Sequence, residues 1–180
     1  QVEITTSASS VSFDNTAIGD SSTIDLTISN TGTGTLNVTN ITSSDANFHA
    51  RPLTLSAATG ASATITLVFK PVSVGEKNTT FTIYSNDPIT PQKTVTGTGT
   101  GVSLVSGNIG TTTWTAANSP YLLTADATVT SGQVLTVDPG AEIIFGGDYD
   151  LTVQGEIVLT GTVSDSISIS GTDGGSIIID

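Results

Sequence analysis

The spacing of the hydrophobic residues changes halfway along this chain, and this change constrains the fold more than any other feature. In the first half, apolar and polar residues alternate, most clearly in residues 24–28 and 65–69. A period of two places successive side chains on opposite faces of a β-strand. The second half instead carries short apolar triplets separated by glycine-marked corners. The sequence therefore predicts an all-β protein made of two different kinds of β structure.

The composition favours strands and thin hydrophobic cores. Glycine occurs 19 times, charged residues make up 11% of the chain and aromatic residues 5%. Serine, threonine and valine are abundant, and β-branched side chains suit a pleated sheet. Hydrophobic residues other than glycine make up 36% of the chain. A sandwich or a narrow solenoid fits this composition better than a large core.

The net charge of −12 is unevenly distributed. Residues 1–101 hold seven acidic and four basic residues, whereas residues 102–180 hold nine acidic residues and no lysine or arginine. Such a surface cannot neutralise phosphates, so nucleic acid is excluded as a partner and anionic membranes are disfavoured. No apolar run reaches the roughly 18 residues of a membrane span, so we expect no membrane insertion.

The chain contains no cysteine. A secreted eukaryotic domain with a thin core often carries disulfides. Their absence, together with the acidic composition rich in serine, threonine and glycine, is more typical of a bacterial exported protein. We therefore expect an extracellular or cell-surface location.

The first half predicts an immunoglobulin-like sandwich over residues 1–101. About seven short strands follow one another, separated by turns such as residues 30–34, 74–78 and 85–88. Asparagine and glycine tolerate the backbone angles of tight turns. Several short strands at spacings of about 8–12 residues are typical of two antiparallel sheets packed face to face.

This half resembles a known family. The segments ISNTGTGTLNVTNI, GASATITLVFKPVSVGEKNTTFTIYSNDP and TVTGTGTG are similar to the ASPM/SPD-2/Hydin-type immunoglobulin-like domain, also described as the choice-of-anchor D domain. The resemblance covers residues 10–101. It implies a seven-stranded sandwich that acts as a spacer or docking module, and it brings no catalytic residues.

The second half predicts a short right-handed parallel β-helix over residues 102–180. Its triplets, such as those at 134–137, 143–145 and 151–153, recur after about 22–24 residues. A repeat of this length with three strands per turn is typical of a solenoid whose coils stack on one another. The segment GTTTWTAANSPYLLTADATVTSGQVLTVDPGAEIIFGGDYDLTVQGEIVLTGT resembles the N-terminal coils of pectate-lyase-like β-helix proteins.

The second half has room for two to three coils, so one end of the solenoid is expected to be open. Terminal coils normally need caps. We therefore expect either a longer solenoid or a subunit that covers this end. Val2–Thr6 is a candidate donor strand for addition to another subunit.

Two acidic residues are the candidate metal ligands. Asp148 and Asp150 lie two positions apart at a glycine corner, and Asp138, Glu142 and Glu156 lie at neighbouring corners. Oxygen ligands that converge in this way bind Ca²⁺. The chain lacks the known calcium-repeat and EF-hand patterns, so solvated acidic corners are the alternative. No other cofactor is expected.

The sequence does not indicate catalysis. His49 is the sole histidine, which leaves a zinc site without ligands and a Ser-His-Asp triad without support. Trp114, Tyr121 and Tyr149 are candidate sugar-stacking residues, but for Trp114 the preferred expectation is packing over the solenoid mouth or at the domain junction. A threonine ladder of the ice-binding kind is missing.

We expect a non-catalytic structural or adhesive module, in which the solenoid is a stiff stalk and the chain is a subunit of a surface filament or array. Its partners would be other protein subunits, bound by strand addition or end-to-end solenoid stacking. The alternatives are an accessory N-terminal region of a carbohydrate-active β-helix enzyme and a glycan-binding module.

Overall fold

The computed structural model describes residues 1–171 and 174–180. The chain divides into two compact units, one of residues 1–72 and 76–100 and the other of residues 73–75 and 101–180. Strands dominate both units, and a single 3-10 turn, η1 (Ala116–Asn118), is the only helical element among the described residues. The expectation of an all-β protein is confirmed.

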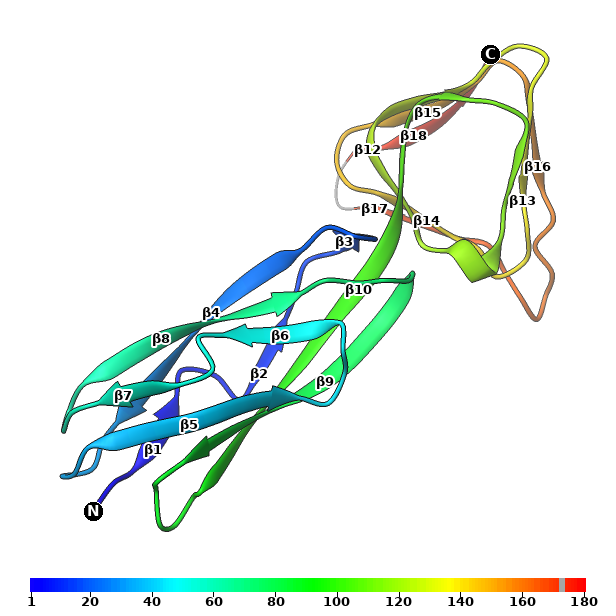
Figure 1. The fold of residues 1–180 in the computed structure, drawn as a ribbon. Coiled ribbons are helices and arrows are strands. Elements are labelled where there is room, and N and C mark those ends of the chain that lie inside the picture. The colour runs from blue at the N-terminus through cyan, green and yellow to red at the C-terminus, as the bar shows by residue number, and fades with distance from the viewer. Residues whose placement is uncertain (172–173) are drawn as a thin grey trace. The chain divides into compact units, whose positions relative to one another are not determined.

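The first unit is a sandwich of two sheets (Figure 1). The first sheet has four strands, and each neighbouring pair runs antiparallel. Its order is β1 (Ile4–Thr6), β4 (Ser22–Asn30), β8 (Ser62–Phe69) and β6 (Phe48–Arg51). The strands β4 and β8 contain the two alternating segments of the sequence, and their inward residues are buried in the sandwich core.

The second sheet of the sandwich is organised around a long strand, β10 (Gln92–Ile109). Its order continues through β9 (Gly75–Ser85), β5 (Leu36–Ser43) and β7 (Leu55–Ala57). Two short strands, β2 (Ser10–Ser12) and β3 (Thr16–Ala17), also pair with β10. The immunoglobulin-like sandwich predicted from the sequence is confirmed.

Four phenylalanine rings form a cluster within the sandwich core. Phe48 stacks on Phe69 with ring centroids 4.7 Å apart, and Phe13 and Phe81 pack against this pair. The glycine-rich run of the sequence makes room for these rings. A Cβ atom at Gly99 would lie 2.7 Å from the Phe69 ring, so glycine is required where β10 passes the cluster.

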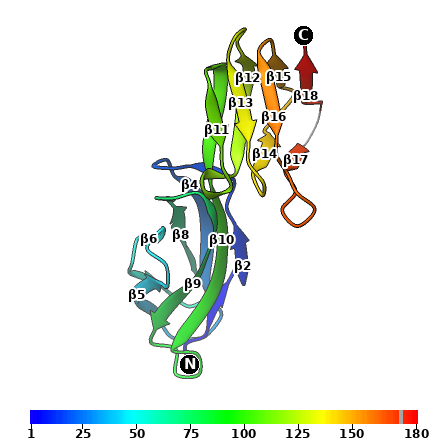
Figure 2. The same cartoon turned by 90° about the vertical axis from the view of Figure 1, so that its right-hand side faces the viewer.

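The second unit is a parallel β-solenoid with three sides. One side is formed by β11 (Thr112–Trp114), β13 (Val134–Val137) and β16 (Glu156–Leu159), which lie side by side in Figure 2. The other two sides begin on β10 and β12 (Tyr121–Val129). One of these sides continues through β14 (Glu142–Phe145) to β17 (Ser168–Gly171). The other continues through β15 (Asp150–Val153) to β18 (Ser176–Ile179). Every pairing between coils is parallel, and the solenoid has about three turns.

The inward side chains of the solenoid stack in ladders that cross the coils. Tyr121, Ile143 and Ile169 form one such ladder, because the register pairs each residue with the next. Corresponding residues on successive coils lie 22 to 26 positions apart along the chain, as in Leu135 with Ile157 and Leu151 with Ile177. The solenoid predicted from the triplet repeat is confirmed, with slightly longer spacing in the last coil.

Two features of the strands were not expected from the sequence. The glycine and threonine residues at 97–101 continue the strand β10, whose buried positions alternate through Val95, Gly97 and Gly99. The strand β12 serves two sides of the solenoid, with residues 121–123 paired to β14 and residues 127–129 paired to β15. A search for apolar triplets misses both features, because glycine and alanine occupy some of the inward positions of these strands.

No helix among the described residues has the length and apolar character needed to cross a membrane.

Candidate interaction surface

The first edge of the sandwich, strand β1, is closed by a carboxylate. The strand pairs with β4, and the backbone N–H of Ile4 points away from β4. This N–H donates to Oδ2 of Asp87 at 2.9 Å. The segment Val2–Thr6 is therefore already used within its own sandwich, which corrects its interpretation as a free donor strand.

Asp87 is 2% exposed and binds three backbone N–H groups. Besides Ile4, the N–H groups of Ile89 and Thr90 donate to Oδ1 at 2.9 and 3.1 Å. The hydrogen bond from Ile4, followed by those from Ile89 and Thr90, holds the pKa of the Asp87 carboxyl below its usual value, against the opposing effect of burial. The carboxylate thus ties β1 to the turn that joins β9 and β10.

The other sandwich edges are short and partly blocked. On β6, the N–H of Phe48 donates to the Asp45 carbonyl and the Phe48 carbonyl accepts from the Ser43 hydroxyl. On β7, the Ala57 carbonyl accepts from the side-chain amide of Asn30. Short edges whose polar groups are already bonded discourage strand addition. The sandwich therefore offers few free backbone groups to a partner strand.

The last coil of the solenoid, made of β16, β17 and β18, presents an open side. Each of these strands pairs with the preceding coil alone. Exposure rises steeply along the ladders. Ile143 and Leu151 in the middle coil are fully buried, whereas Leu159, Ile169 and Ile179 in the last coil are 51%, 47% and 73% exposed, although they occupy inward positions. The last coil therefore exposes hydrophobic side chains that an inner coil buries.

The backbone of the last coil is also open. The N–H groups of Glu156, Ser168 and Ser176 donate back to the preceding coil. Because backbone groups alternate along a parallel strand, the intervening N–H and C=O groups point to the open side. These groups belong to the residues with inward side chains: Ile157, Leu159, Ile169, Gly171, Ile177 and Ile179. A further parallel strand would satisfy them.

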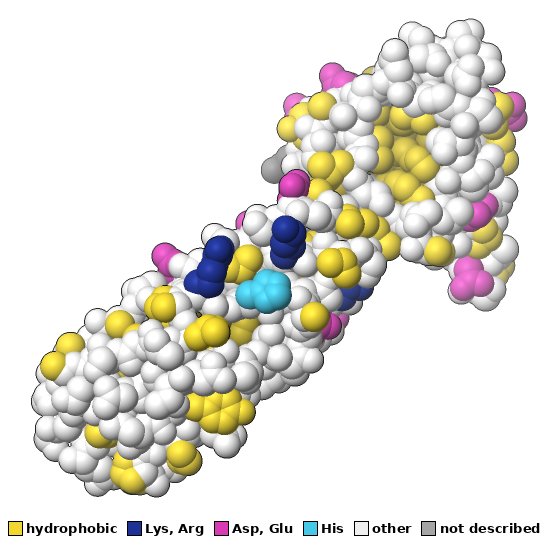
Figure 3. Space-filling model, in the orientation of Figure 1, with side chains coloured by type: hydrophobic (Ala, Val, Ile, Leu, Met, Phe, Trp, Pro, Cys, Tyr) yellow, Lys and Arg dark blue, Asp and Glu magenta, His cyan; other side chains and the backbone are white. Residues whose placement is uncertain are grey.

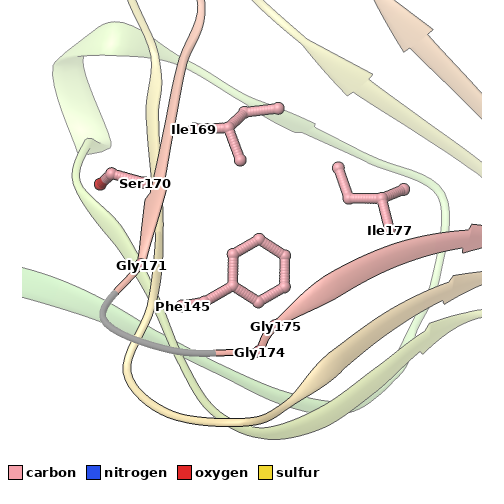
Figure 4. A pocket seen from close by; sticks show the side chains of 7 residues that line it. All are labelled: Phe145, Ile169, Ser170, Gly171, Gly174, Gly175 and Ile177. Carbon is pink, nitrogen blue, oxygen red and sulfur yellow. The ribbon is translucent and has the colours of Figure 1, made fainter.

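A hollow of about 430 Å³ lies in the last coil above Phe145 (Figure 4). Ile169 and Ile177 flank the Phe145 ring, and Gly171 and Gly175 lie against it. Gly171 is the residue stacked on Phe145, so its ladder has no side chain in the last coil. Phe145, Ile169 and Ile177 contribute apolar side chains to the lining, and the glycines leave room for side chains of an added layer.

The acidic candidates do not gather into a metal centre within the described residues. No group of three or more histidine, cysteine, aspartate or glutamate residues among them is placed to hold a metal ion. Asp148 lies against Gly174, and the N–H of Asp150 donates to the Asp126 carboxylate at 3.0 Å. Glu142 and Glu156 begin separate strands, and Asp138 follows β13. Calcium binding by Asp148 and Asp150 stays a prediction.

The aromatic candidates have structural surroundings. Trp114 is 5% exposed and stacks on Tyr121, with ring centroids 4.8 Å apart and an interplanar angle of 12°. The Tyr121 hydroxyl accepts from the Thr115 N–H at 2.9 Å. Both rings belong to the solenoid core, so neither has a free face for a sugar. The Tyr149 ring lies against Gly147, and His49 is exposed on β6.

A two-sheet sandwich and a parallel solenoid together define an immunoglobulin-like module joined to stacked β-coils. The family described as "Abnormal spindle-like microcephaly-assoc'd, ASPM-SPD-2-Hydin" (ASH) matches residues 3–93. The chain belongs to this family, as its sequence resemblance implied. A comparison with curated proteins finds no match.

Several solved structures are similar to part of this chain. The PapD-like domain 7 of human CEP192 is 15% identical, with 55% of this chain and 84% of that domain covered and a TM-score of 0.49. A Porphyromonas gingivalis W83 protein of unknown function is 16% identical, with 55% and 46% covered and a TM-score of 0.48. The E. coli chaperone DraB is 14% identical, with 56% and 55% covered and a TM-score of 0.45. The present chain thus spans about half the length of the latter two.

Proposed function

We propose that this chain is a non-catalytic structural module of an extracellular or cell-surface assembly, and that it joins other subunits through the open side of its last coil. The observation that carries the proposal is the exposure of Leu159, Ile169 and Ile179 at positions that face the solenoid core. An added layer of strands would bury these side chains and pair the open backbone groups at the same time.

The energetics favour covering this surface. Fully burying a side chain of this size contributes about 1.5–3 kcal/mol, so completing the burial of three half-exposed side chains contributes about 1 kcal/mol each. Backbone pairing along three strands of four residues adds to this gain. The sandwich edges, in contrast, have their outward groups engaged by Asp87, Ser43 and Asn30.

The packing of both units supports a structural role. The sandwich interior is occupied by the phenylalanine cluster and the aliphatic residues of its sheets, and the solenoid interior by the stacked ladders. The resemblance of the first half to its family implies that this half acts as a spacer or docking module. The acidic, cysteine-free composition supports the extracellular part of the proposal.

The assembly proposal is tested by light scattering on the purified protein. The wild-type chain is expected to show a concentration-dependent mass above the 18.1 kDa of one chain. The double variant Leu159→Lys and Ile169→Lys should remain monomeric while retaining the β signature in circular dichroism. Ile178→Lys is the matched control, since Ile178 is a 39% exposed isoleucine on the outer face of the same coil.

A wild-type protein that stays monomeric at millimolar concentration would contradict the assembly proposal. An equal loss of assembly in the Ile178→Lys control would also contradict it, because the effect would then not belong to the inward ladder positions. The location is tested separately, by labelling intact producing cells with a membrane-impermeant reagent, where an unlabelled protein would contradict it.

A further inference from the structure

The outer face of the first sheet carries a small cationic pocket. It has a volume of about 260 Å³ and is lined by Ser21, His49, Arg51, Val68 and Lys70, a set called the cationic pocket below. His49 and Arg51 lie on β6, and Val68 lies on β8. Lys70 directly follows β8, and Ser21 directly precedes β4. Figure 3 shows the histidine next to basic side chains on one face of the sandwich.

The floor of the cationic pocket is a hydrophobic side chain on the outer side of the sheet. Val68 lies between Leu67 and Phe69, which are members of the sandwich core. The alternation of a strand therefore directs Val68 outward. It is nonetheless only 5% exposed, and the side chains around it are those of the pocket. The cations are thus arranged around a shielded apolar floor.

The basic side chains of the pocket have no partner. Among the described residues, the side chains of His49, Arg51 and Lys70 make no hydrogen bond or ion pair, and all three residues are exposed. Asp25 on β4 is aligned with Thr66 on β8, which in turn is aligned with Arg51, and the Asp25 carboxylate accepts from the Thr66 hydroxyl at 2.8 Å. Asp20 adjoins Ser21 in the sequence. The guanidinium and the ammonium are therefore free to bind an external anion.

The clustering of basic side chains in one pocket is unusual for this chain. The protein has only four lysine and arginine residues against sixteen acidic ones, and two of the four line this one pocket with the sole histidine. Electrostatic interactions at physiological salt are screened over about 8 Å, so an approaching group responds to the local cations more than to the net charge. A carboxylate that reaches the pocket meets a guanidinium that can bind it in a bidentate manner.

We propose that the cationic pocket binds carboxylate side chains of an acidic protein surface, and that its occupant is the C-terminal unit of a second copy of this chain. Charge complementarity identifies the occupant, because residues 102–180 carry nine acidic residues and no lysine or arginine. Such a contact joins two different surfaces and so propagates from copy to copy, in the way that a head-to-tail interface does.

The acidic unit has a suitable group at one solenoid corner. The register pairs Ala127 with Leu151, which places Asp126 beside Asp150 on the adjacent coil. The Asp126 carboxylate accepts the Asp150 N–H at 3.0 Å, so the two acidic residues are held together. Two neighbouring carboxylates without a nearby base gain from a cationic partner.

The lining of the pocket favours a polypeptide over the other anionic polymers. No phenylalanine, tyrosine or tryptophan lines this pocket, so it offers no aromatic face on which a sugar ring could stack. Nucleic acid requires a track of several phosphate-binding cations, whereas this pocket supplies one arginine and one lysine. The small volume fits individual carboxylate groups that extend from a folded surface.

Carbodiimide cross-linking of the whole chain tests this contact. A mixture of unlabelled and ¹⁵N-labelled protein is treated with a zero-length carbodiimide, and the linked peptides are identified by mass spectrometry. We expect Lys70 to be joined to acidic residues of 102–180 in peptides that mix the two isotopes. Arg51→Gln should reduce the yield of these links about fivefold, and about 0.5 M NaCl should do the same.

Lys93 provides the control, since it lies on β10 outside the cationic pocket. Lys93→Gln should leave the Lys70 links unchanged. Lys70 links that never mix isotopes, or that are no more frequent than Lys93 links, would overturn the proposal. This test is independent of assembly through the last coil. The double variant Leu159→Lys and Ile169→Lys should keep the Lys70 links that mix the two isotopes.

Discussion

The backbone N–H of Ile4 donates a 2.9 Å hydrogen bond to the carboxylate of Asp87, which is 83 residues further along the chain. Ile4 belongs to the edge strand of one sheet, whereas Asp87 follows β9 of the other sheet. One buried carboxylate therefore joins the two sheets and occupies the outward N–H of an edge strand. The arrangement leaves one fewer free backbone group on this edge strand.

Removal of this carboxylate should destabilise the sandwich. Asp87→Ala leaves three backbone N–H groups without their acceptor, and hydrogen bonds to charged groups contribute about 1.5–3 kcal/mol. We expect a loss of about 2–3 kcal/mol in urea denaturation, with faster hydrogen exchange at the Ile4 amide. Asp14→Ala is the control, since Asp14 is exposed, and a loss there of similar size would contradict the assigned role of Asp87.

The contribution of Asp87 should depend on pH. Its pKa is lowered in the folded state by the hydrogen bond from Ile4. A group whose folded pKa is depressed stabilises the fold above its unfolded pKa of about 3.9, and this stabilisation is lost as the pH falls through the folded value. The stability difference between wild type and Asp87→Asn should therefore shrink between about pH 5 and pH 2. A neutral control, Thr5→Ala, should show a pH-independent difference, and a constant Asp87→Asn difference would contradict the prediction.

The glycine in the middle of β10 should not tolerate a side chain. A Cβ atom at Gly99 would lie 2.7 Å from Phe69, which is itself fully buried against Phe48. Overpacking of a core costs about 1–3 kcal/mol, so Gly99→Ala should lower the midpoint of thermal unfolding. Gly110→Ala, whose Cβ would have its nearest neighbour at 3.8 Å, should change stability by less than about 0.5 kcal/mol. Equal effects of the two substitutions would refute the close fit of Gly99.

Shortening an inward side chain should destabilise the solenoid less in the last coil than in the middle coil. Ile143 and Ile169 occupy the same ladder, but Ile143 is fully buried and Ile169 is 47% exposed. Ile143→Ala should cost about 2–5 kcal/mol, and Ile169→Ala less than about half as much. Denaturation monitored through Trp114 fluorescence measures both values, because Trp114 belongs to the solenoid core. A larger cost at Ile169 would mean that the last coil is already covered.

The sequence predicted the repetitive parts of this fold well. The alternation in residues 24–28 and 65–69 predicted β4 and β8, and the triplets predicted β13, β14 and β15, because in each case burial follows the spacing of apolar residues. The sequence did not predict that β10 continues through its glycines. Glycine is needed there because phenylalanine rings from distant strands leave no room for a side chain.

The sites were much less visible in the sequence. Asp87 lies in the motif Ser-Asn-Asp-Pro, which reads locally as a turn, and its partner Ile4 is known only once the sheets are paired. The cationic pocket combines residues of β6 and β8 whose alignment follows from the pairing of His49 with Val68. Contacts of this kind depend on strand register, which local patterns do not specify.

The open side of the last coil is tested most directly by amide hydrogen exchange, resolved by NMR in dilute and concentrated protein. In dilute protein, the amides of Ile157, Leu159, Ile169 and Ile177 should exchange quickly, while those of Val158 and Ile178, which point to the preceding coil, are slower. At high concentration the first group should become protected as an added layer pairs with it. Protection of the first group that is the same at all concentrations would contradict the account.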